Sequence, residues 1–134
     1  MSRLPRALEH LKTGFAAEAA TAARYRAQAG QAEAEGKPNL AARWLALAEE
    51  KDRLARLLLQ AAGQIRGEDR ALADALAEEA FENEILYPKM IREVDAETAR
   101  VLADVVAAQG EHAQALERLR SEAQAAGGDV AAAA

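Results

Sequence analysis

The chain has 134 residues, enough for one domain with a hydrophobic core but hardly for two. The net charge of −5, with both signs interspersed, argues against a nucleic-acid-binding protein, which would carry a basic face. The absence of cysteine excludes disulfides, thiolate metal sites and cysteine nucleophiles, so any metal would be held by carboxylates and by the two histidines.

The composition and the spacing of helix breakers predict an all-α protein. Ala, Leu, Glu and Arg dominate, and aromatic residues make up only 4% of the chain. Short polar stretches such as GKPN (36–39) and RGED (66–69) divide the chain into four long helices. We expect one four-helix bundle over residues 1–126, with helices at about 5–35, 40–65, 70–93 and 96–125, followed by a disordered tail at 127–134.

The sequence also predicts where the protein resides. No apolar run approaches the ~20 residues that a membrane span requires. The first residues, MSRLPRALEHLKTG, have no hydrophobic core like that of a signal peptide. We therefore expect a cytoplasmic protein that binds neither membranes nor nucleic acid.

An apolar stripe follows one face of each expected helix at alternating three- and four-residue steps, and each stripe is polar near its centre. The interrupting residues are Glu18, Lys51, Glu79, Glu82, Gln109 and His112. One charged residue on such a stripe is usually a boundary residue that reaches water. Interruptions in the middle of four helices would instead converge on one level of a bundle, where carboxylates repel one another unless a cation lies among them. The spacing therefore predicts a buried polar or metal-binding site.

Four segments resemble the helix motifs of rubrerythrins, which are ferritin-like diiron-carboxylate proteins. The segment FAAEAATAARY (15–25) resembles the first-helix motif, and LAEEAFENEILYPKM (76–90) resembles the third. The segment AEAEGKPNLAARWLALAEEKDRLA (32–55) is similar to the second-helix region, and AAQGEHA (107–113) resembles the fourth-helix motif, which normally reads Glu-x-x-His-Ala. The resemblance implies a ferritin-like four-helix bundle with a metal site at its centre.

The resemblance assigns metal-ligand positions residue by residue. It implies that Glu18, Glu79, Glu82 and His112 are metal ligands. Three other ligand positions are altered: Lys51 and Gln109 stand where the family has bridging glutamates, and Leu54 stands where it has a histidine. Without the bridging carboxylates, nothing holds two metals ~4 Å apart, the separation that two-metal chemistry needs. We therefore expect fewer than two metals at this site.

Two arrangements of the altered site remain open. Three ionised carboxylates and the Lys51 ammonium sum to −2, which one divalent ion would neutralise. The first arrangement therefore holds a single iron, manganese or zinc ion on His112 and some of the glutamates. In the second, no metal is bound, and the ammonium of Lys51 lies among the carboxylates with Gln109 and His112 completing a hydrogen-bond network.

The expected connection between the second and third helices is about six residues long and reaches only ~20 Å when extended. A return along a helix of ~26 residues, as in ferritin-like bundles with a crossover, would span ~39 Å. The chain therefore forms either a plain up-down-up-down bundle or a homodimer in which helices are exchanged, and we favour a homodimer.

Two functions follow from these alternatives. The resemblance implies a rubrerythrin-type, peroxidase-like oxidoreductase that handles peroxide or dioxygen at a metal. Because the chain lacks the cysteine-rich module of classical rubrerythrins, such an enzyme would need a separate electron donor. The alternative is a non-catalytic metal-binding or metal-free structural bundle in which Lys51 pairs with the core carboxylates. No catalytic residue is assigned.

Overall fold

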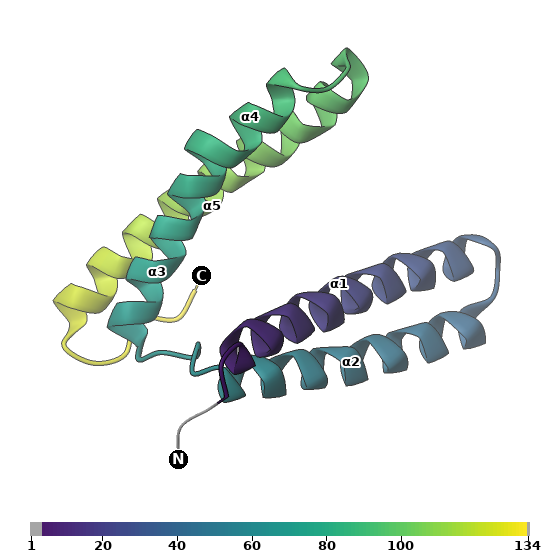
Figure 1. Ribbon diagram of the computed structural model, residues 1–134, viewed down its shortest axis with the longest axis horizontal. Coiled ribbons are helices and arrows are strands. Elements are labelled where there is room, and N and C mark those ends of the chain that lie inside the picture. The colour runs from purple at the N-terminus through teal and green to yellow at the C-terminus, as the bar shows by residue number, and fades with distance from the viewer. Residues whose placement is uncertain (1–3, 134) are drawn as a thin grey trace. The chain divides into compact units, whose positions relative to one another are not determined.

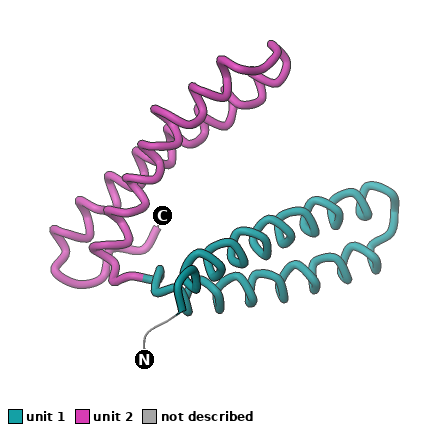
Figure 2. The backbone as a smooth tube through the Cα atoms, in the orientation of Figure 1, with its two compact units in different colours: residues 1–65 teal, residues 66–134 magenta. Residues whose placement is uncertain are grey.

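The computed structural model describes residues 4–133, and every regular element in this range is a helix. The all-α class expected from the sequence is therefore confirmed. The chain divides into two compact units, residues 1–65 and 66–134 (Figure 2). Each unit is an antiparallel pair of helical arms, which we call the first and the second hairpin.

The first hairpin consists of α1 (Ala7–Ala34) and α2 (Pro38–Ala61), joined by a turn at 35–37 (Figure 1). Gly36 has a φ of 72°, which glycine adopts without strain. The Lys37 N–H donates to the carbonyl of Ala32 and closes the end of α1, a glycine-based helix stop. Pro38 then begins α2, where a missing N–H costs nothing. The sequence thus encodes a tight reversal at this point.

Small residues form the interface between α1 and α2. In residues 4–133 the buried apolar side chains are alanines, with Leu72 of the other unit the single larger one. The buried alanines of α2 recur every seven residues, whereas those of α1 are separated by seven and then three residues, both of which are coiled-coil steps. The set is Ala22, Ala29, Ala32, Ala41, Ala48 and Ala55. Methyl groups at these positions let the two backbones approach closely.

The end of α2 differs from the sequence-based expectation, which extended this helix to about residue 65. The helix ends at Ala61, because Gly63 takes a φ of 70°. The Gln64 N–H donates to the carbonyl of Leu59, which completes a second glycine-based stop. Residues 64–67 that follow have no regular structure.

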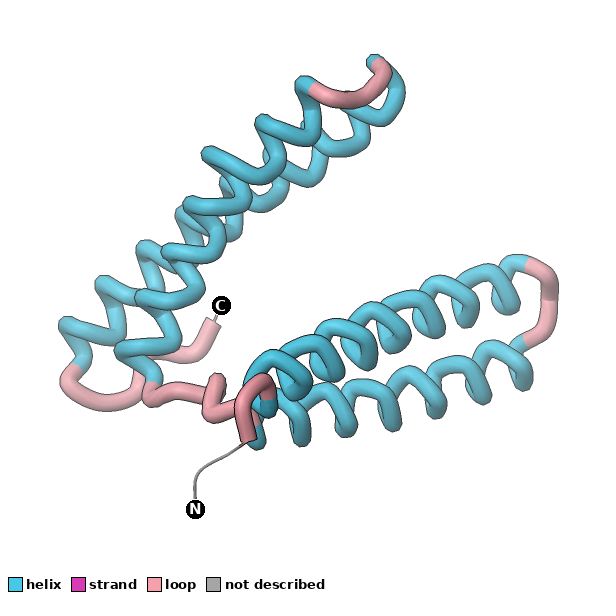
Figure 3. Tube along the Cα trace, in the orientation of Figure 1, coloured by secondary structure: helices cyan, strands magenta, loops and turns pink. Residues whose placement is uncertain are grey.

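The second hairpin pairs a broken arm with one long helix. The broken arm consists of α3 (Glu68–Phe81), a π-helical turn η1 (Glu82–Leu86) and α4 (Tyr87–Arg92), and the long arm is α5 (Ala96–Ala126). Figure 3 shows both arms as helix, joined by a loop. Pro88 has no N–H for the carbonyl of Glu84, so the regular α pattern cannot continue through this point. The chain widens instead, and the Tyr87 N–H donates to the Glu82 carbonyl five residues back. The single bent helix expected at 70–93 is thus three consecutive helical segments.

Both hairpins leave large apolar side chains exposed. One stripe of α2, which we call the open face of the first hairpin, carries apolar residues that are exposed or half-buried; Leu47, for example, is 51% exposed. The residues of this stripe are Leu40, Trp44, Leu47, Lys51, Leu54 and Leu58. On the second hairpin Leu86, Val101 and Leu119 are exposed. A helix that exposes such a stripe normally buries it against another element. None of the helices described here is long and apolar enough to cross a membrane.

Candidate polar site

An ion pair lies near the middle of the first hairpin. The Nζ atom of Lys51 on α2 is 2.8 Å from the Oε2 atom of Glu18 on α1. The two side chains are 31% and 25% exposed, so the pair is half-buried. The distance between the two charged groups makes this contact an ion pair. Its angles are not those of a hydrogen bond, so Glu18 Oε2 is buried without a hydrogen-bond donor. The sequence predicted that Lys51 pairs with carboxylates, and within this hairpin the carboxylate in contact with it is that of Glu18.

Apolar side chains flank this pair along both helices. Lys51 lies seven residues from Trp44 and from Leu58, so it occupies a coiled-coil position whose other members are apolar. Tyr25 on α1 packs against Trp44, with ring centroids 5.2 Å apart. The charge of Lys51 is therefore held beside an apolar stripe, with 31% of its side chain exposed.

The carboxylate of Glu18 controls the protonation of this lysine. Its contact with Glu18 is the largest cause that raises the pKa of Lys51 above the ordinary value, while partial desolvation lowers the pKa by a smaller amount. Because the charged form is favoured, Lys51 is an ammonium ion at neutral pH. It can donate hydrogen bonds and neutralise carboxylates, but it is a poor ligand for a metal and a poor nucleophile.

A second polar cluster lies between the arms of the second hairpin. The Nε2 atom of Gln109 on α5 donates to the Oε2 atom of Glu82 at 3.1 Å. Three other acceptor oxygens of this hairpin are buried without a hydrogen-bond donor: Glu79 Oε2, Asn83 Oδ1 and Gln109 Oε1. Buried acceptors of this kind are uncommon because each loses its hydration without compensation. The second hairpin therefore contains three buried acceptor oxygens that have no donor.

The π-helical turn determines which residues form this cluster. Glu82 is the first residue of η1, and the wider turn shifts every side chain after it relative to an α-helix. Asn83 follows Glu82 at once, and its amide oxygen joins the buried set. Our reading of the sequence missed Asn83, because a stripe extrapolated at regular α-helical spacing passes through Glu82 and Leu86. The signal available in the sequence was Pro88, which disturbs the turn before it.

The remaining expected ligands behave differently. His112 is exposed on α5 and is not among the buried polar atoms of the second hairpin. Leu54 is half-buried on the open face of the first hairpin. The structure brings Glu18 into contact with Lys51 in the first hairpin and Glu82 into contact with Gln109 in the second. These are four of the six residues that were expected to converge.

The donor set fits a two-metal centre poorly. Within residues 4–133 no three His, Cys, Asp or Glu side chains are grouped so that they could hold a metal ion. The buried oxygen of Glu18, which the rubrerythrin resemblance makes a ligand, is taken by an ammonium group. The acceptors of the second hairpin that lack donors are one carboxylate and two neutral amides, a set that suits a hard cation or a hydrogen-bond donor.

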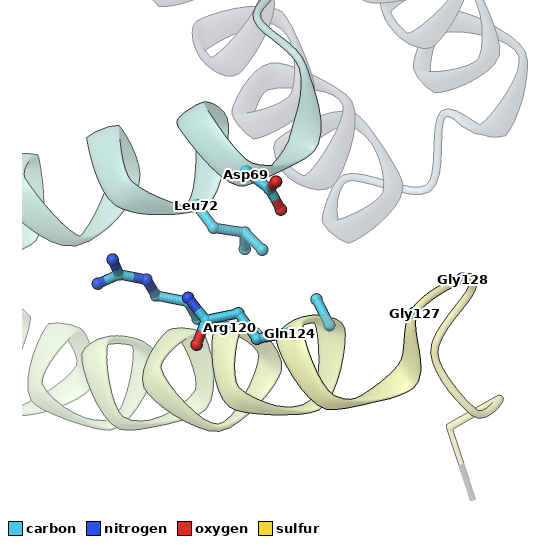
Figure 4. Close-up of a pocket in the computed structure, with 7 residues that line it drawn as sticks. Asp69, Leu72, Arg120, Gln124, Gly127 and Gly128 are labelled. Carbon is cyan, nitrogen blue, oxygen red and sulfur yellow. The ribbon is translucent and has the colours of Figure 1, made fainter.

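A pocket of about 560 Å³ opens at the other end of the second hairpin, where α3 begins and α5 ends (Figure 4). Its lining includes Asp69, Leu72 and Arg120, together with Gly127 and Gly128 after α5. None of the three acceptor oxygens without donors belongs to this lining. The pocket therefore lies apart from the polar cluster.

Comparison of the sequence with models of known protein families finds no match, and comparison with curated proteins finds none either. The resemblance to rubrerythrins accordingly rests on the four helix motifs and on the residues that they contain.

Proposed function

We propose that this chain is a non-catalytic, rubrerythrin-like helical bundle in which Lys51 provides the positive charge that a metal provides in intact members of that family. The observation that carries the proposal is the contact of 2.8 Å between Lys51 Nζ and Glu18 Oε2. An ammonium at this position occupies the carboxylate that a metal would need, and it repels a divalent ion. The role of the protein is then structural: it associates through the polar and apolar faces of its hairpins.

The donors and acceptors of the two hairpins support this proposal. Lys51 has three N–H donors and one carboxylate in contact, so it can serve further acceptors. The second hairpin offers the buried oxygens of Glu79, Asn83 and Gln109, none of which has a donor. Each of these oxygens is costly while it is buried without a donor.

The positions of the polar residues along the helices also agree. Lys51 lies ten residues before the end of α2, which corresponds to about 15 Å of helix. Glu79 lies eleven residues after the start of α3, which corresponds to about 17 Å. Lys51 and Glu79 therefore lie at similar distances along their helices from the connection between α2 and α3.

Metal analysis tests this proposal. Protein purified without chelators and then loaded with Fe(II) should retain no stoichiometric metal, and EDTA should not change its melting temperature. Two irons per chain, with an absorbance change on addition of peroxide, would show an intact diiron site and contradict the proposal.

The second candidate is a rubrerythrin-type oxidoreductase that uses one metal to handle peroxide or dioxygen. The observation that favours it is the set of buried acceptor oxygens of the second hairpin that have no donor, because a hard cation would satisfy them as an ammonium would. One retained metal per chain, lost when Glu79 and Glu82 are changed to Gln but retained when exposed Glu78 and Glu84 are changed in the same way, would favour this candidate.

Restoration of the altered ligands provides an independent test of the register. The variant Lys51→Glu, Leu54→His, Gln109→Glu returns each altered position to the residue type that the rubrerythrin motifs carry there. If the site is a degenerate diiron site, this variant should bind iron that the wild type does not bind. A variant that folds but gains no metal would show that the proposed register is wrong.

A further inference from the structure

The pocket at the end of the second hairpin is lined by charged side chains from both of its helices (Figure 4). Asp69 belongs to the first turn of α3, and Arg120 lies six residues before the end of α5. The volume of about 560 Å³ is in the range of pockets that bind small organic molecules. The lining contains none of the residues on which the proposed function rests.

Arg120 is the one cationic residue of the second unit that is withdrawn from solvent. Residues 66–134 contain seven Lys or Arg, of which six are exposed and Arg120 is half-buried. The unit also contains fifteen Asp or Glu, yet among the described residues no acceptor contacts the guanidinium group of Arg120. A guanidinium is always charged and has five N–H donors, so its partial burial without an acceptor is costly. The position of Arg120 therefore favours an anionic group in the pocket.

The carboxylate of Asp69 argues against a simple anion as the ligand. Asp69 is exposed, it lies on the other side of Leu72 from the guanidinium group (Figure 4), and no described cation contacts it. A simple anion would be attracted by Arg120 and repelled by Asp69, and a simple cation would experience the reverse. A molecule with a carboxylate at one end and an ammonium at the other satisfies both side chains.

The offset between the two charged residues favours a short peptide over a single amino acid. Along the helix axes, Asp69 lies about 1.5 Å from the start of α3 and Arg120 lies about 9 Å from the end of α5. These two helix ends meet at the pocket, so the residues are offset by roughly 7 Å along the hairpin. The two charges of a single amino acid are carried on one carbon atom and cannot span this offset. Three extended residues reach about 10 Å and can span it.

An apolar surface lies between the two charges. Leu72 is buried at 9% exposure, and its side chain points into the space between α3 and α5 (Figure 4). Ala123 of α5 also lines the pocket, as do Gly127 and Gly128, which add no side chain to it. A Cβ atom added at Gly128 would meet nothing within 4 Å, so the pocket is open on this side. An apolar side chain of a bound peptide can therefore pack against Leu72.

We infer that this pocket binds a short peptide with free ends, with the peptide carboxylate on Arg120 and the peptide ammonium on Asp69. The guanidinium group can donate two parallel hydrogen bonds to the carboxylate, a geometry that also orients the ligand. The side-chain amide of Gln124, which lines the same pocket, has the donors and the acceptor that a peptide group needs. A peptide with either end blocked loses one charged contact and keeps the other.

Titration of the isotope-labelled full chain with the tripeptide Ala-Leu-Ala, followed by two-dimensional NMR, tests this inference. Amide signals of residues 68–72 and 120–128 should shift at millimolar peptide, and those of the first hairpin should not. The N-acetylated and the C-amidated tripeptides should each bind about tenfold more weakly or worse, which is the effect of losing one charge-assisted hydrogen bond. These peptides test both contacts on the wild-type protein, so the result does not depend on the folding of a variant.

Substitutions assign each end of the peptide to its residue. Arg120→Gln should weaken binding of the free tripeptide about tenfold or more and leave binding of the amidated tripeptide unchanged, because that peptide has no carboxylate to lose. Asp69→Asn should weaken binding of the free tripeptide and leave binding of the acetylated one unchanged. Arg118→Gln and Glu68→Gln are the matched controls, since they remove the same charges at exposed positions of the same helices. Both controls should bind as the wild type does.

The possible outcomes decide the inference in either direction. The absence of shifts with the free tripeptide, or equal binding of the free and the blocked peptides, overturns it. Equal weakening by the control variants and the pocket variants would show attraction to the net charge of this helix end and would also overturn it. Free leucine that binds as tightly as the tripeptide would show that the offset between Asp69 and Arg120 selects no peptide, and this result overturns the assignment of a peptide ligand.

Discussion

Substitution of Ala48 by leucine tests the packing that positions the ion pair. Ala48 is fully buried on α2, and it lies one helical turn before Lys51. The register set by the Glu18–Lys51 contact places Ala22 of α1 at the same level. An isobutyl group at position 48 has no free space in this interface, so α1 and α2 must separate or the new side chain must adopt a strained rotamer.

The cost follows from the burial of this site. Insertion of larger side chains into well-packed interiors typically costs about 1–3 kcal/mol. In a chain of this size each kcal/mol lowers the melting temperature by about 3–5 °C, so we expect a decrease of about 3–15 °C. Urea unfolding followed by circular dichroism at 222 nm measures the free energy directly.

Ala46→Leu is the matched control, because Ala46 is exposed on the same helix and the two residues have similar helix propensities. It should leave the free energy of unfolding within about 0.5 kcal/mol of the wild type. If Ala48→Leu is as stable as Ala46→Leu, the close approach of α1 and α2 is wrong, and with it the geometry that brings Lys51 to Glu18.

Three further predictions concern single positions. Gly30→Ala should stabilise the protein by about 1 kcal/mol in urea unfolding, because nothing lies near the added methyl group; Gly14→Ala should gain less, because its methyl group would lie 3.1 Å from Leu58 Cδ1. Asp95 caps α5 by accepting from the Thr98 N–H, which is the largest cause that lowers its pKa. Its stabilising effect, measured as the difference in melting temperature from Asp95→Ala, should be present above about pH 4 and lost as the pH falls through the lowered pKa. A difference that does not shrink as the pH is lowered below about 4 would contradict this. The pKa of Lys51 is raised above its ordinary value. The difference in melting temperature between the wild type and Lys51→Met should therefore be constant up to about pH 10, and it should be lost as the pH rises through the raised pKa. A difference that disappears near pH 7 would refute the assignment.

The sequence predicted helices well because long periodic segments and strong breakers define them. GKPN combines a glycine and a proline at adjacent helix ends, and the structure places the turn of the first hairpin there. The end of α2 was predicted about four residues too late. The apolar residue Ile65 continues the helical periodicity, whereas the left-handed conformation of Gly63 had already stopped the helix.

The candidate site could be predicted only in part, because periodicity identifies the face of a helix but not its packing partner. Stripes at three- and four-residue steps selected Glu18 and Lys51, which the structure brings into contact. The same stripes selected Glu82 but not the next residue, Asn83, because the π-helical turn of η1 changes the helical register of the second hairpin. A local widening of this kind depends on how the chain accommodates Pro88, which periodicity does not encode.

Replacement of the ion pair by apolar residues would separate its contribution to stability from its contribution to specificity. Desolvation offsets most of the attraction between half-buried charges, so apolar side chains of similar size can be as stable in their place. A polar residue on an apolar coiled-coil stripe nevertheless fixes register and partner choice. We therefore expect Glu18→Leu with Lys51→Met to melt at or above the wild-type temperature and to form mixed species larger than a dimer. Glu18→Leu alone should melt below the wild type, because it leaves the ammonium without its carboxylate.

Thermal melting and native mass spectrometry of these two variants give separate readouts. If the double variant melts as low as Glu18→Leu alone, the loss of the pair itself destabilises the protein, and its role is stability. If the double variant is stable and remains a uniform species of wild-type mass, apolar complementarity is sufficient to select the partner. A stable protein that forms several species would show that Lys51 selects the partner of the first hairpin.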